Sequence, residues 1–240
     1  MEKGLVVITG ASSGIGRKTA EVFSKEGYPL LLMARRVEKI EALNLPNSIA
    51  VKGDVTDLFS FEKAIEKGEK EFGSVQTLIN NAGMMLLGDT ALQDPEEWRK
   101  MYDVNVLGVL HGIHLVLQKM IKRKEGTIVN ISSVAGRKTF PNHAAYCGTK
   151  FAVHALTENI REEVAKDNVR LITIAPGAVE TELLSHTTSK EIKERYENWK
   201  EEIGGALSSE TIADSILFAV KQPQNVCIRE IVIAATTQGL

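Results

Sequence analysis

At two places in the chain a tyrosine is followed four positions later by a lysine, as Tyr146 with Lys150 and Tyr196 with Lys200. Tyrosine has an ordinary pKa of about 10, so it is a poor acid or base at neutral pH. A nearby ammonium group favours the phenolate, and positions i and i+4 of a helix lie on one face. The spacing therefore suits proton transfer, but a spacing that occurs twice does not by itself identify a site.

The two tyrosines have different neighbours. Tyr196 lies in the segment Glu191–Ile203, where apolar residues recur at helical spacing among charged ones. This pattern is typical of an amphipathic helix, and we interpret Tyr196 as part of its apolar face. Tyr146 instead follows the apolar run Gly126–Ile131 and stands thirteen residues after Ser133. Because ligands bind at the carboxyl ends of strands in open α/β sheets, the sequence favours Tyr146.

Short apolar runs alternate with helical segments along the chain. Several runs are apolar at consecutive positions, as in strands that are covered on both faces. The expected strands are Leu5–Ile8, Leu30–Met33, Ile49–Val51, Val75–Ile79, Thr127–Ile131, Val169–Ile174 and Glu230–Ala234. The expected helices are Arg17–Lys25, Ser60–Phe72, Pro95–Lys122, Ala144–Lys166 and Glu210–Val220. The alternation predicts an α/β fold with a doubly wound parallel sheet of the Rossmann type and helices on both faces.

Length and composition narrow the classes of function. A chain of 240 residues suits a single domain that covers residues 1–240. Its 29 Lys and Arg against 31 Asp and Glu give no electrostatic basis for binding nucleic acid or a membrane. The first apolar run is too short for a signal peptide, and the cysteines form no CxxC, so we expect a cytoplasmic protein. His111 and His114 form HxxH without a suitably spaced third ligand, so we expect no metal.

A glycine-rich segment, TGASSGIG, follows the first expected strand at Thr9–Gly16. Glycine lets the backbone turn sharply and approach a pyrophosphate, and the helix N-terminus that follows offers free N–H groups. The spacing is G-x-x-x-G-x-G and not the commoner G-x-G-x-x-G, so the glycines alone are a weak signal. Their place at the head of an α/β chain predicts a dinucleotide site with contacts from Gly10, Ser12, Ser13, Gly14, Ile15 and Gly16.

The end of the second expected strand indicates which dinucleotide binds. Sites that prefer NAD usually place an acidic residue there to bind the ribose 2′-hydroxyl. This chain has Arg35 and Arg36 instead, and guanidinium groups suit a 2′-phosphate. We therefore predict NADP(H), with Arg35 as the first contact and Arg36 as the second. The alternative is that both arginines are solvated at the strand end.

Several motifs occur together in a fixed order. They are Thr9-Gly10-x-x-x-Gly14-x-Gly16, Asn80-Asn81-Ala82-Gly83, Asn105, Ser133, Tyr146-x-x-x-Lys150 and Pro176-Gly177. As a set they resemble the short-chain dehydrogenase/reductase family, in its short-subunit branch, from Gly4 to about Thr181. The segment Ala34–Arg36 and the ending Pro223–Gln238 also resemble bacterial NADP-dependent members that act on small hydroxy acids or aldehydes.

The resemblance implies hydride transfer between NADP(H) and a small carbonyl or alcohol substrate. Tyr146 would be the general acid/base, and Lys150 would lower its pKa and hold the nicotinamide ribose. Ser133 would hydrogen-bond the reacting oxygen. Asn105 would hold a water that links Lys150 to solvent.

The resemblance also implies the remaining contacts. Asn81, Ala82 and Gly83 would line the nicotinamide-side ribose, and the segment after the sixth strand would supply Pro176, Gly177, Val179 and Thr181. Thr181 would meet the carboxamide or the diphosphate, and Leu183–Leu207 would form the substrate lid. Asp54 would either contact the adenine or cap the next helix. Arg137 and Lys138 would either attract a substrate carboxylate or lie in a solvated loop.

Other functions remain open at this stage. A catalytically silent NADP(H)-binding redox sensor could use the same fold, although it would need no acid/base residue. An epimerase or dehydratase of the superfamily would need a longer chain. The resemblance further implies a homotetramer or homodimer packed through the helices Pro95–Lys122 and Ala144–Lys166. The sequence does not identify the substrate.

Overall fold

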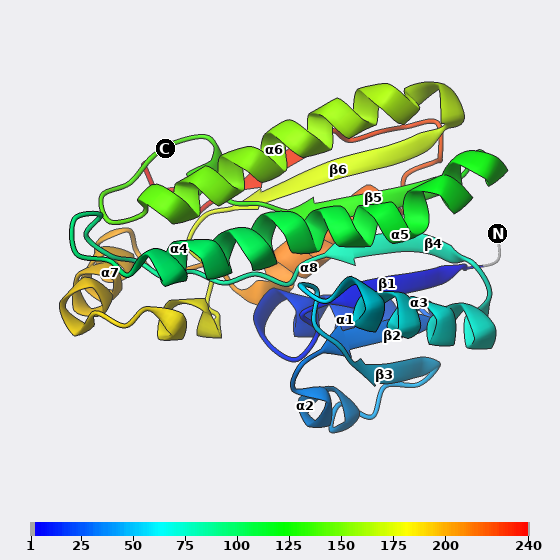
Figure 1. Ribbon diagram of the computed structural model, residues 1–240, viewed down its shortest axis with the longest axis horizontal. Coiled ribbons are helices and arrows are strands. Elements are labelled where there is room, and N and C mark those ends of the chain that lie inside the picture. The colour runs from blue at the N-terminus through cyan, green and yellow to red at the C-terminus, as the bar shows by residue number, and fades with distance from the viewer. Residues whose placement is uncertain (1–2, 240) are drawn as a thin grey trace.

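The computed structural model describes residues 3–239 and has a seven-stranded sheet at its centre (Figure 1). The strands are β1 (Leu5–Thr9), β2 (Leu30–Ala34), β3 (Ser48–Lys52), β4 (Val75–Asn80), β5 (Gly126–Ile131), β6 (Val169–Pro176) and β7 (Glu230–Ile233). All neighbours pair in parallel, in the order β3-β2-β1-β4-β5-β6-β7. The order reverses beside β1, and such a switch point is where doubly wound sheets bind ligands.

Helices cover both faces of the sheet, which confirms the predicted doubly wound architecture (Figure 1). One face carries α3 (Leu58–Phe72), α5 (Gly108–Arg123) and α6 (Ala144–Val164). The other carries α1 (Gly14–Lys25) and α8 (Ser209–Val220), which pack against each other. The shorter helices are α2 (Val37–Glu41), α4 (Pro95–Tyr102) and α7 (Lys190–Glu202), with 3-10 turns at Val134–Gly136, Ala165–Asp167 and Glu182–His186.

The apolar core forms two layers, one on each side of the sheet. In β1, Val7 faces the layer under α3 and α5, whereas Val6 and Ile8 face the layer under α1 and α8. Both sets of side chains are fully buried, which explains why the strands are apolar at consecutive positions. Each buried Val or Ile stabilises the fold by roughly 1.5–3 kcal/mol relative to an exposed one. This packing fixes the carboxyl ends of the strands, where the site lies.

The helical run Pro95–Arg123 is long and apolar enough, by length and composition, to cross a membrane. A core helix of a globular domain passes the same test. Here Val109, Ile113 and Val116 are buried against the sheet in one of the two core layers. The run is not one uniform helix, because a π-helical turn at Asp103–Leu107 separates α4 from α5. Such turns are frequent at functional sites, and this one carries Asn105.

Candidate active site

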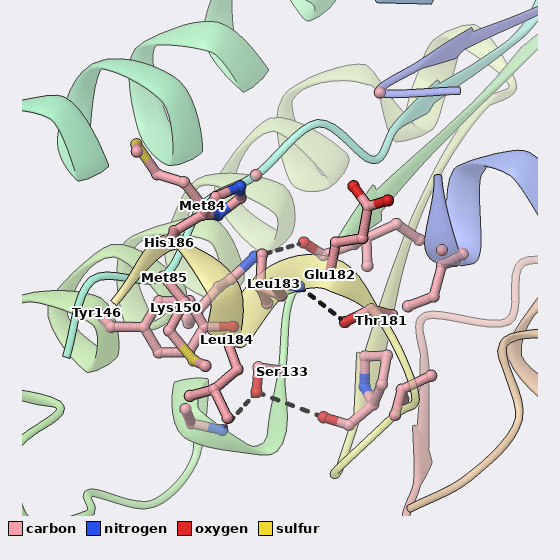
Figure 2. Close-up of a pocket in the computed structure, with 18 of the residues that line it drawn as sticks. Met84, Met85, Ser133, Tyr146, Lys150, Thr181, Glu182, Leu183, Leu184 and His186 are labelled. Carbon is pink, nitrogen blue, oxygen red and sulfur yellow. Dashed lines mark hydrogen bonds between the residues drawn. The ribbon is translucent and has the colours of Figure 1, made fainter. Parts of the chain in front are cut away.

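A cavity of about 540 Å³ lies at the carboxyl ends of the strands (Figure 2). The glycine turn, the ends of β2, β4, β5 and β6, the first turns of α6 and the predicted lid all contribute to its lining. Every predicted site residue lines this cavity except Gly16 and Asn105. The structure therefore brings together residues that are as far apart in the sequence as Gly10 and Thr181.

The glycine turn is packed so tightly that its glycine positions have no room for a side chain. Gly14 has a φ of +51°, in the left-handed region that favours glycine. A Cβ at Gly16 would collide with the carbonyl of Gly10 and with the Asn81 side chain. The Asn81 amide donates hydrogen bonds to the carbonyls of Thr9 (2.9 Å) and Gly10 (3.2 Å). Asn81 thus fixes the turn from β4, a role that the sequence did not indicate.

The N-terminus of α1 faces the cavity and fits the phosphates of a dinucleotide. Ser13 precedes the helix but makes no side-chain hydrogen bond to its free N–H groups. Those groups and the helix dipole favour an anion at this point. Thr181 lies against the same turn, because a Cβ at Gly14 would come within 3.0 Å of its methyl group. Gly14 lines the cavity without a side chain, which lets a pyrophosphate approach the backbone there.

Next to the glycine turn, after β2, the Arg36 guanidinium is held by two groups. It donates to the Ser13 hydroxyl at 3.2 Å and to the Glu182 carboxylate at 2.8 Å. Lys39 pairs with the same carboxylate at 3.2 Å, and the two cations hold the pKa of Glu182 below its usual value. Arg35 lines the cavity and is exposed. A positive cluster therefore stands where a 2′-phosphate is predicted, with a carboxylate bound to it.

Asp54 is not a helix cap. Its carboxylate accepts hydrogen bonds from the backbone N–H (2.9 Å) and the hydroxyl (2.8 Å) of Thr56 in a local turn. Asp57 caps α3, accepting from the N–H groups of Phe59 and Ser60. Of the two interpretations of Asp54, the capping role is therefore wrong, because the turn at Thr56 places the helix start after Asp57. Contact with the adenine stays a prediction.

Tyr146 and Lys150 lie one turn apart on α6, and both are buried (Figure 2). The Lys150 ammonium lies 5.7 Å from the Tyr146 ring centroid and donates to the Ile131 carbonyl at 3.0 Å. Burial lowers the pKa of Lys150 to about 8. Burial also raises the pKa of Tyr146 above its usual value, and the neighbouring Ser133 hydroxyl opposes this rise. This differs from the expectation that Lys150 lowers the tyrosine pKa, because the phenol is covered by apolar side chains.

The Ser133 hydroxyl is placed beside Tyr146 by the ends of two strands (Figure 2). It accepts a hydrogen bond from the N–H of Ala135 at 3.0 Å, at the start of the 3-10 turn that follows β5. It also donates to the carbonyl of Pro176, at the end of β6, at 3.3 Å. These contacts fix the hydroxyl at the edge of the sheet, as the sequence predicted.

Asn105 lies behind the cavity lining. Its amide oxygen accepts from the N–H of Met84 at 2.8 Å, and its amide nitrogen donates to the Met84 carbonyl at 2.9 Å. The same nitrogen donates to the Thr149 hydroxyl at 3.1 Å. Asn105 therefore joins the segment after β4 to the helix that carries Tyr146 and Lys150. The predicted water contact stays a prediction.

Sequence reasoning missed His154, a residue of α6 that anchors this helix to the sheet. Its Nδ1 lies 2.9 Å from the Ser132 hydroxyl and 3.0 Å from the Lys150 carbonyl oxygen. Its Nε2 lies 3.1 Å from the Glu230 carboxylate on β7. His154 thus ties α6 to the ends of β5 and β7. Its position four residues after Lys150, on the same helix face, was the available signal.

The predicted lid covers the Tyr146 end of the cavity (Figures 1 and 2). The 3-10 turn Glu182–His186 and helix α7 run past the carboxyl end of the sheet. Leu184 and Ile192 belong to the apolar cluster around Tyr146, and so does Tyr196, whose ring lies 6.1 Å from that of His143. Tyr196 is on the apolar face of its helix, as expected, and this face lines the cavity, as the predicted lid requires.

The basic pair between Ser133 and Tyr146 points elsewhere. Arg137 forms an ion pair with Glu230, and the Lys138 ammonium lies 5.6 Å from the Phe140 ring centroid. Neither residue lines the cavity. The structure therefore does not support the interpretation that this pair attracts a substrate carboxylate, because Glu230 already holds the arginine.

The histidine pair on α5 has an ordinary structural contact, since His111 Nδ1 lies 2.8 Å from the Val55 carbonyl oxygen. Within residues 3–239, no group of three or more His, Cys, Asp or Glu side chains is arranged to hold a metal ion. The expectation that the protein binds no metal stays a prediction.

Comparison with known proteins agrees with this geometry. Residues 4–192 match the short chain dehydrogenase family. An uncharacterised oxidoreductase of Staphylococcus saprophyticus is 40% identical over 246 residues, which cover 98% of this chain and 97% of that protein.

Two solved structures share the fold closely. The closed form of a serine dehydrogenase complexed with NADP+ superposes with a TM-score of 0.90 at 26% identity, covering 98% of this chain and 96% of its own. A 3-ketoacyl-(acyl-carrier-protein) reductase from Brucella melitensis complexed with NADH gives 0.88 at 25% identity, covering 98% of both chains. The protein described here therefore belongs to the short-chain dehydrogenase family and is an oxidoreductase of that family.

Proposed function

We propose that the protein is an NADP(H)-dependent oxidoreductase that interconverts a small carbonyl compound and its alcohol. The observation that carries this proposal is the convergence of Ser133, Tyr146 and Lys150 with the glycine turn in one cavity. The NADP+ complex of the similar serine dehydrogenase supports a nicotinamide cofactor, and Arg35 and Arg36 favour the phosphorylated form. When bound, the cofactor supplies or accepts the hydride, and the protein supplies orientation and electrostatics.

Tyr146 donates its phenolic proton to the carbonyl oxygen during reduction and removes a proton from the alcohol during oxidation. Burial raises its pKa, so the phenol holds its proton at neutral pH and releases it only as the substrate oxygen gains negative charge from the hydride. Ser133 gives a hydrogen bond to the same substrate oxygen. Its bond to Pro176 is long, at 3.3 Å, so the hydroxyl can turn to the substrate at small cost.

Lys150 stabilises the negative charge that develops on the Tyr146 oxygen as the proton leaves. The Ile131 carbonyl fixes the ammonium near the phenol, and a Cβ at Gly83 would lie 3.9 Å from it. Lys150 is therefore also accessible to the ribose beside Gly83. Asn105 acts as a positioning residue through Met84 and Thr149, and holds the water that relays protons to Lys150.

The cofactor contacts follow the geometry of the cavity. The turn would hold the pyrophosphate, and Arg35 and Arg36 would hold the 2′-phosphate. Asp54 would contact the adenine, and the segments after β4 and β6 would hold the nicotinamide half. The full proposed set is Gly10, Ser12, Ser13, Gly14, Ile15, Gly16, Arg35, Arg36, Asp54, Asn81, Ala82, Gly83, Tyr146, Lys150, Pro176, Gly177, Val179 and Thr181. Of these, Gly16 does not line the cavity and would act by allowing the turn to close.

Exposed apolar side chains on the helices α4 to α6 support a homodimer or homotetramer. Tyr102, Leu107, Leu110 and Phe151 are all exposed in the single chain. Packing two such helix pairs together would remove this apolar surface from water. Light scattering of the purified protein will show an oligomer, and Phe151→Glu will shift it toward the monomer.

The direct test of the proposed function is loss of NADPH absorbance on mixing the protein with a panel of small aldehydes and ketones. NADH serves as the second cofactor under the same conditions. Turnover that is faster with NADPH supports the proposal, whereas faster turnover with NADH would refute the role of Arg35 and Arg36. Cofactor binding without turnover of any carbonyl would favour the redox sensor instead.

A further inference from the structure

The wall of the cavity around the Tyr146 phenol is apolar. Met84 and Met85, which follow β4, belong to the apolar cluster that contains Tyr146, as does Leu184 of the lid. Met85 and Leu184 lie beside the Tyr146 ring (Figure 2). Ile192 and Tyr196 of α7 close the same cluster. A reacting carbonyl at Tyr146 would therefore have hydrocarbon and thioether groups around the rest of its carbon skeleton.

His143 adds an aromatic face to this wall and no charge. Its ring lies 5.6 Å from the Phe140 ring and 6.3 Å from the Tyr146 ring. Its Nδ1 lies 2.6 Å from the Pro141 carbonyl oxygen, so the ring donates a hydrogen bond to the backbone there. Burial lowers the pKa of His143, which keeps the imidazole neutral at pH 7.

The cations of the lid that line the cavity are paired with carboxylates. Lys200 lies 2.6 Å from Glu197 and 3.6 Å from Glu180, and Arg195 lies 3.6 Å from Glu191. These carboxylates offset the positive charge that an anionic substrate would need.

The remaining lysine and arginine side chains near the cavity also have other partners or lie at its cofactor end. Arg36 is held by Glu182 and Ser13, and Arg35 stands beside it after β2. Lys150 is buried and donates to Ile131. Arg137, which lies between Ser133 and Tyr146 in the sequence, is paired with Glu230 outside the cavity.

We propose that the substrate is a neutral carbonyl compound with an apolar alkyl or aryl group, and not a hydroxy acid or another carboxylate. This inference rests on the proposed function and names its substrate class. In the reduction, the carbonyl carbon takes up a hydride from the reduced cofactor and the oxygen takes up the proton of Tyr146.

The physical reason is the cost of moving a charge from water. A carboxylate placed against Met85 and Leu184 would lose its hydration without gaining an ion pair or several hydrogen bonds. An alkyl or aryl group gains from the same contact, by about 0.8 kcal/mol for each methylene removed from water. The two methionines are flexible and polarisable, so the wall can adapt to groups of different shape.

A matched pair of aldehydes tests the inference on the wild-type protein. Methyl 4-formylbenzoate and 4-formylbenzoate have the same reacting group and differ in whether the para substituent is a neutral ester or a carboxylate. We expect kcat/KM with NADPH to be about 100-fold higher for the ester. A ratio below about 10 would overturn the inference.

A positive charge introduced into the apolar wall tests whether the preference for the ester arises at Leu184. Leu184→Lys places an ammonium there, and the ester-to-acid ratio should fall at least about tenfold, because the carboxylate gains a partner. Leu92→Lys is the matched control, since Leu92 is 86% exposed and lies outside the cavity. An unchanged ratio in Leu184→Lys, or an equal fall in Leu92→Lys, would contradict the placement of the substrate against Leu184.

A binding measurement separates failure of the substrate class from failure of the proposed function. Tyr146→Phe removes the acid and keeps the apolar wall, so calorimetry with NADPH present can compare the two aldehydes without turnover. Tighter binding of the ester supports the inference even if the wild type reduces neither compound. Equal or tighter binding of the carboxylate would overturn the inference even if the wild type is an active reductase.

Discussion

The two tyrosine–lysine pairs have the same spacing and line the same cavity, but their ammonium groups have different partners. Lys200 lies beside Glu197 and Glu180, and these two carboxylates also raise the pKa of Tyr196, which burial brings to about 12. Lys150 is held by a neutral carbonyl, that of Ile131. Its charge is therefore available to the phenolate of Tyr146. We therefore propose that the spacing supports proton transfer only where no carboxylate offsets the ammonium.

Replacing each lysine by methionine should give the largest difference in kcat between the two pairs. Lys150→Met should lower kcat by about 100-fold, because the developing phenolate loses its counter-charge. Lys200→Met should leave kcat within about threefold, since that ammonium is already neutralised. Steady-state rates with NADPH and the best carbonyl substrate will measure both. Equal losses in the two variants would show that the environment does not distinguish the pairs.

The pH dependence of the free energy of unfolding tests whether the Lys150 ammonium is desolvated. The pKa of Lys150 is lowered to about 8 by burial, from 10.5 for the free side chain. Between these values the unfolded chain binds more protons than the folded one, so Lys150 makes stability rise with pH in this window. From pH 7.5 to 10 the wild type should gain about 2 kcal/mol in free energy of unfolding relative to Lys150→Met.

Denaturation with urea at both pH values measures this difference. Lys200→Met keeps the buried lysine, so it serves as the control and should follow the wild-type pH dependence. A wild type and a Lys150→Met variant that respond equally to pH would show that the ammonium of Lys150 is not desolvated.

The smallest expected effect concerns a carboxylate at the cofactor end. Glu182 holds Arg36 and Lys39, and a 2′-phosphate would have to displace it. Because this ion pair is exposed, Glu182→Gln should tighten NADPH binding by only about threefold and leave NADH binding unchanged. Calorimetry with both cofactors will measure this. Weaker NADPH binding in the variant would show that Glu182 supports the site and does not compete for it.

The sheet was predictable because its signal is local. Buried parallel strands such as Leu30–Ala34 are apolar on both faces, and a short run of consecutive apolar residues is typical of such strands. Element ends were less predictable. Helix α1 begins at Gly14 and not at Arg17, because glycines required by the turn also form the first helical turn. Helix α2, at Val37–Glu41, is too short for a periodic signal.

The chemistry of the site was predictable where it depended on residue type and order, as for Ser133, Tyr146 and Lys150. The contacts between residues far apart in the sequence were not predictable. Arg137 forms an ion pair with Glu230, which lies on the edge strand β7, and no sequence pattern predicts this pairing. The effect of burial on the Tyr146 pKa likewise depends on the lid, which folds over the site from a distant segment.

The central claim is tested most directly by comparing kcat with NADPH for Tyr146→Phe and Tyr196→Phe. We predict a loss of about 1000-fold in Tyr146→Phe, with NADPH binding within about threefold of the wild type, and a change of less than about tenfold in Tyr196→Phe. A Tyr146→Phe variant that keeps more than about a tenth of the wild-type kcat, or a Tyr196→Phe variant that loses as much as Tyr146→Phe, would contradict the account.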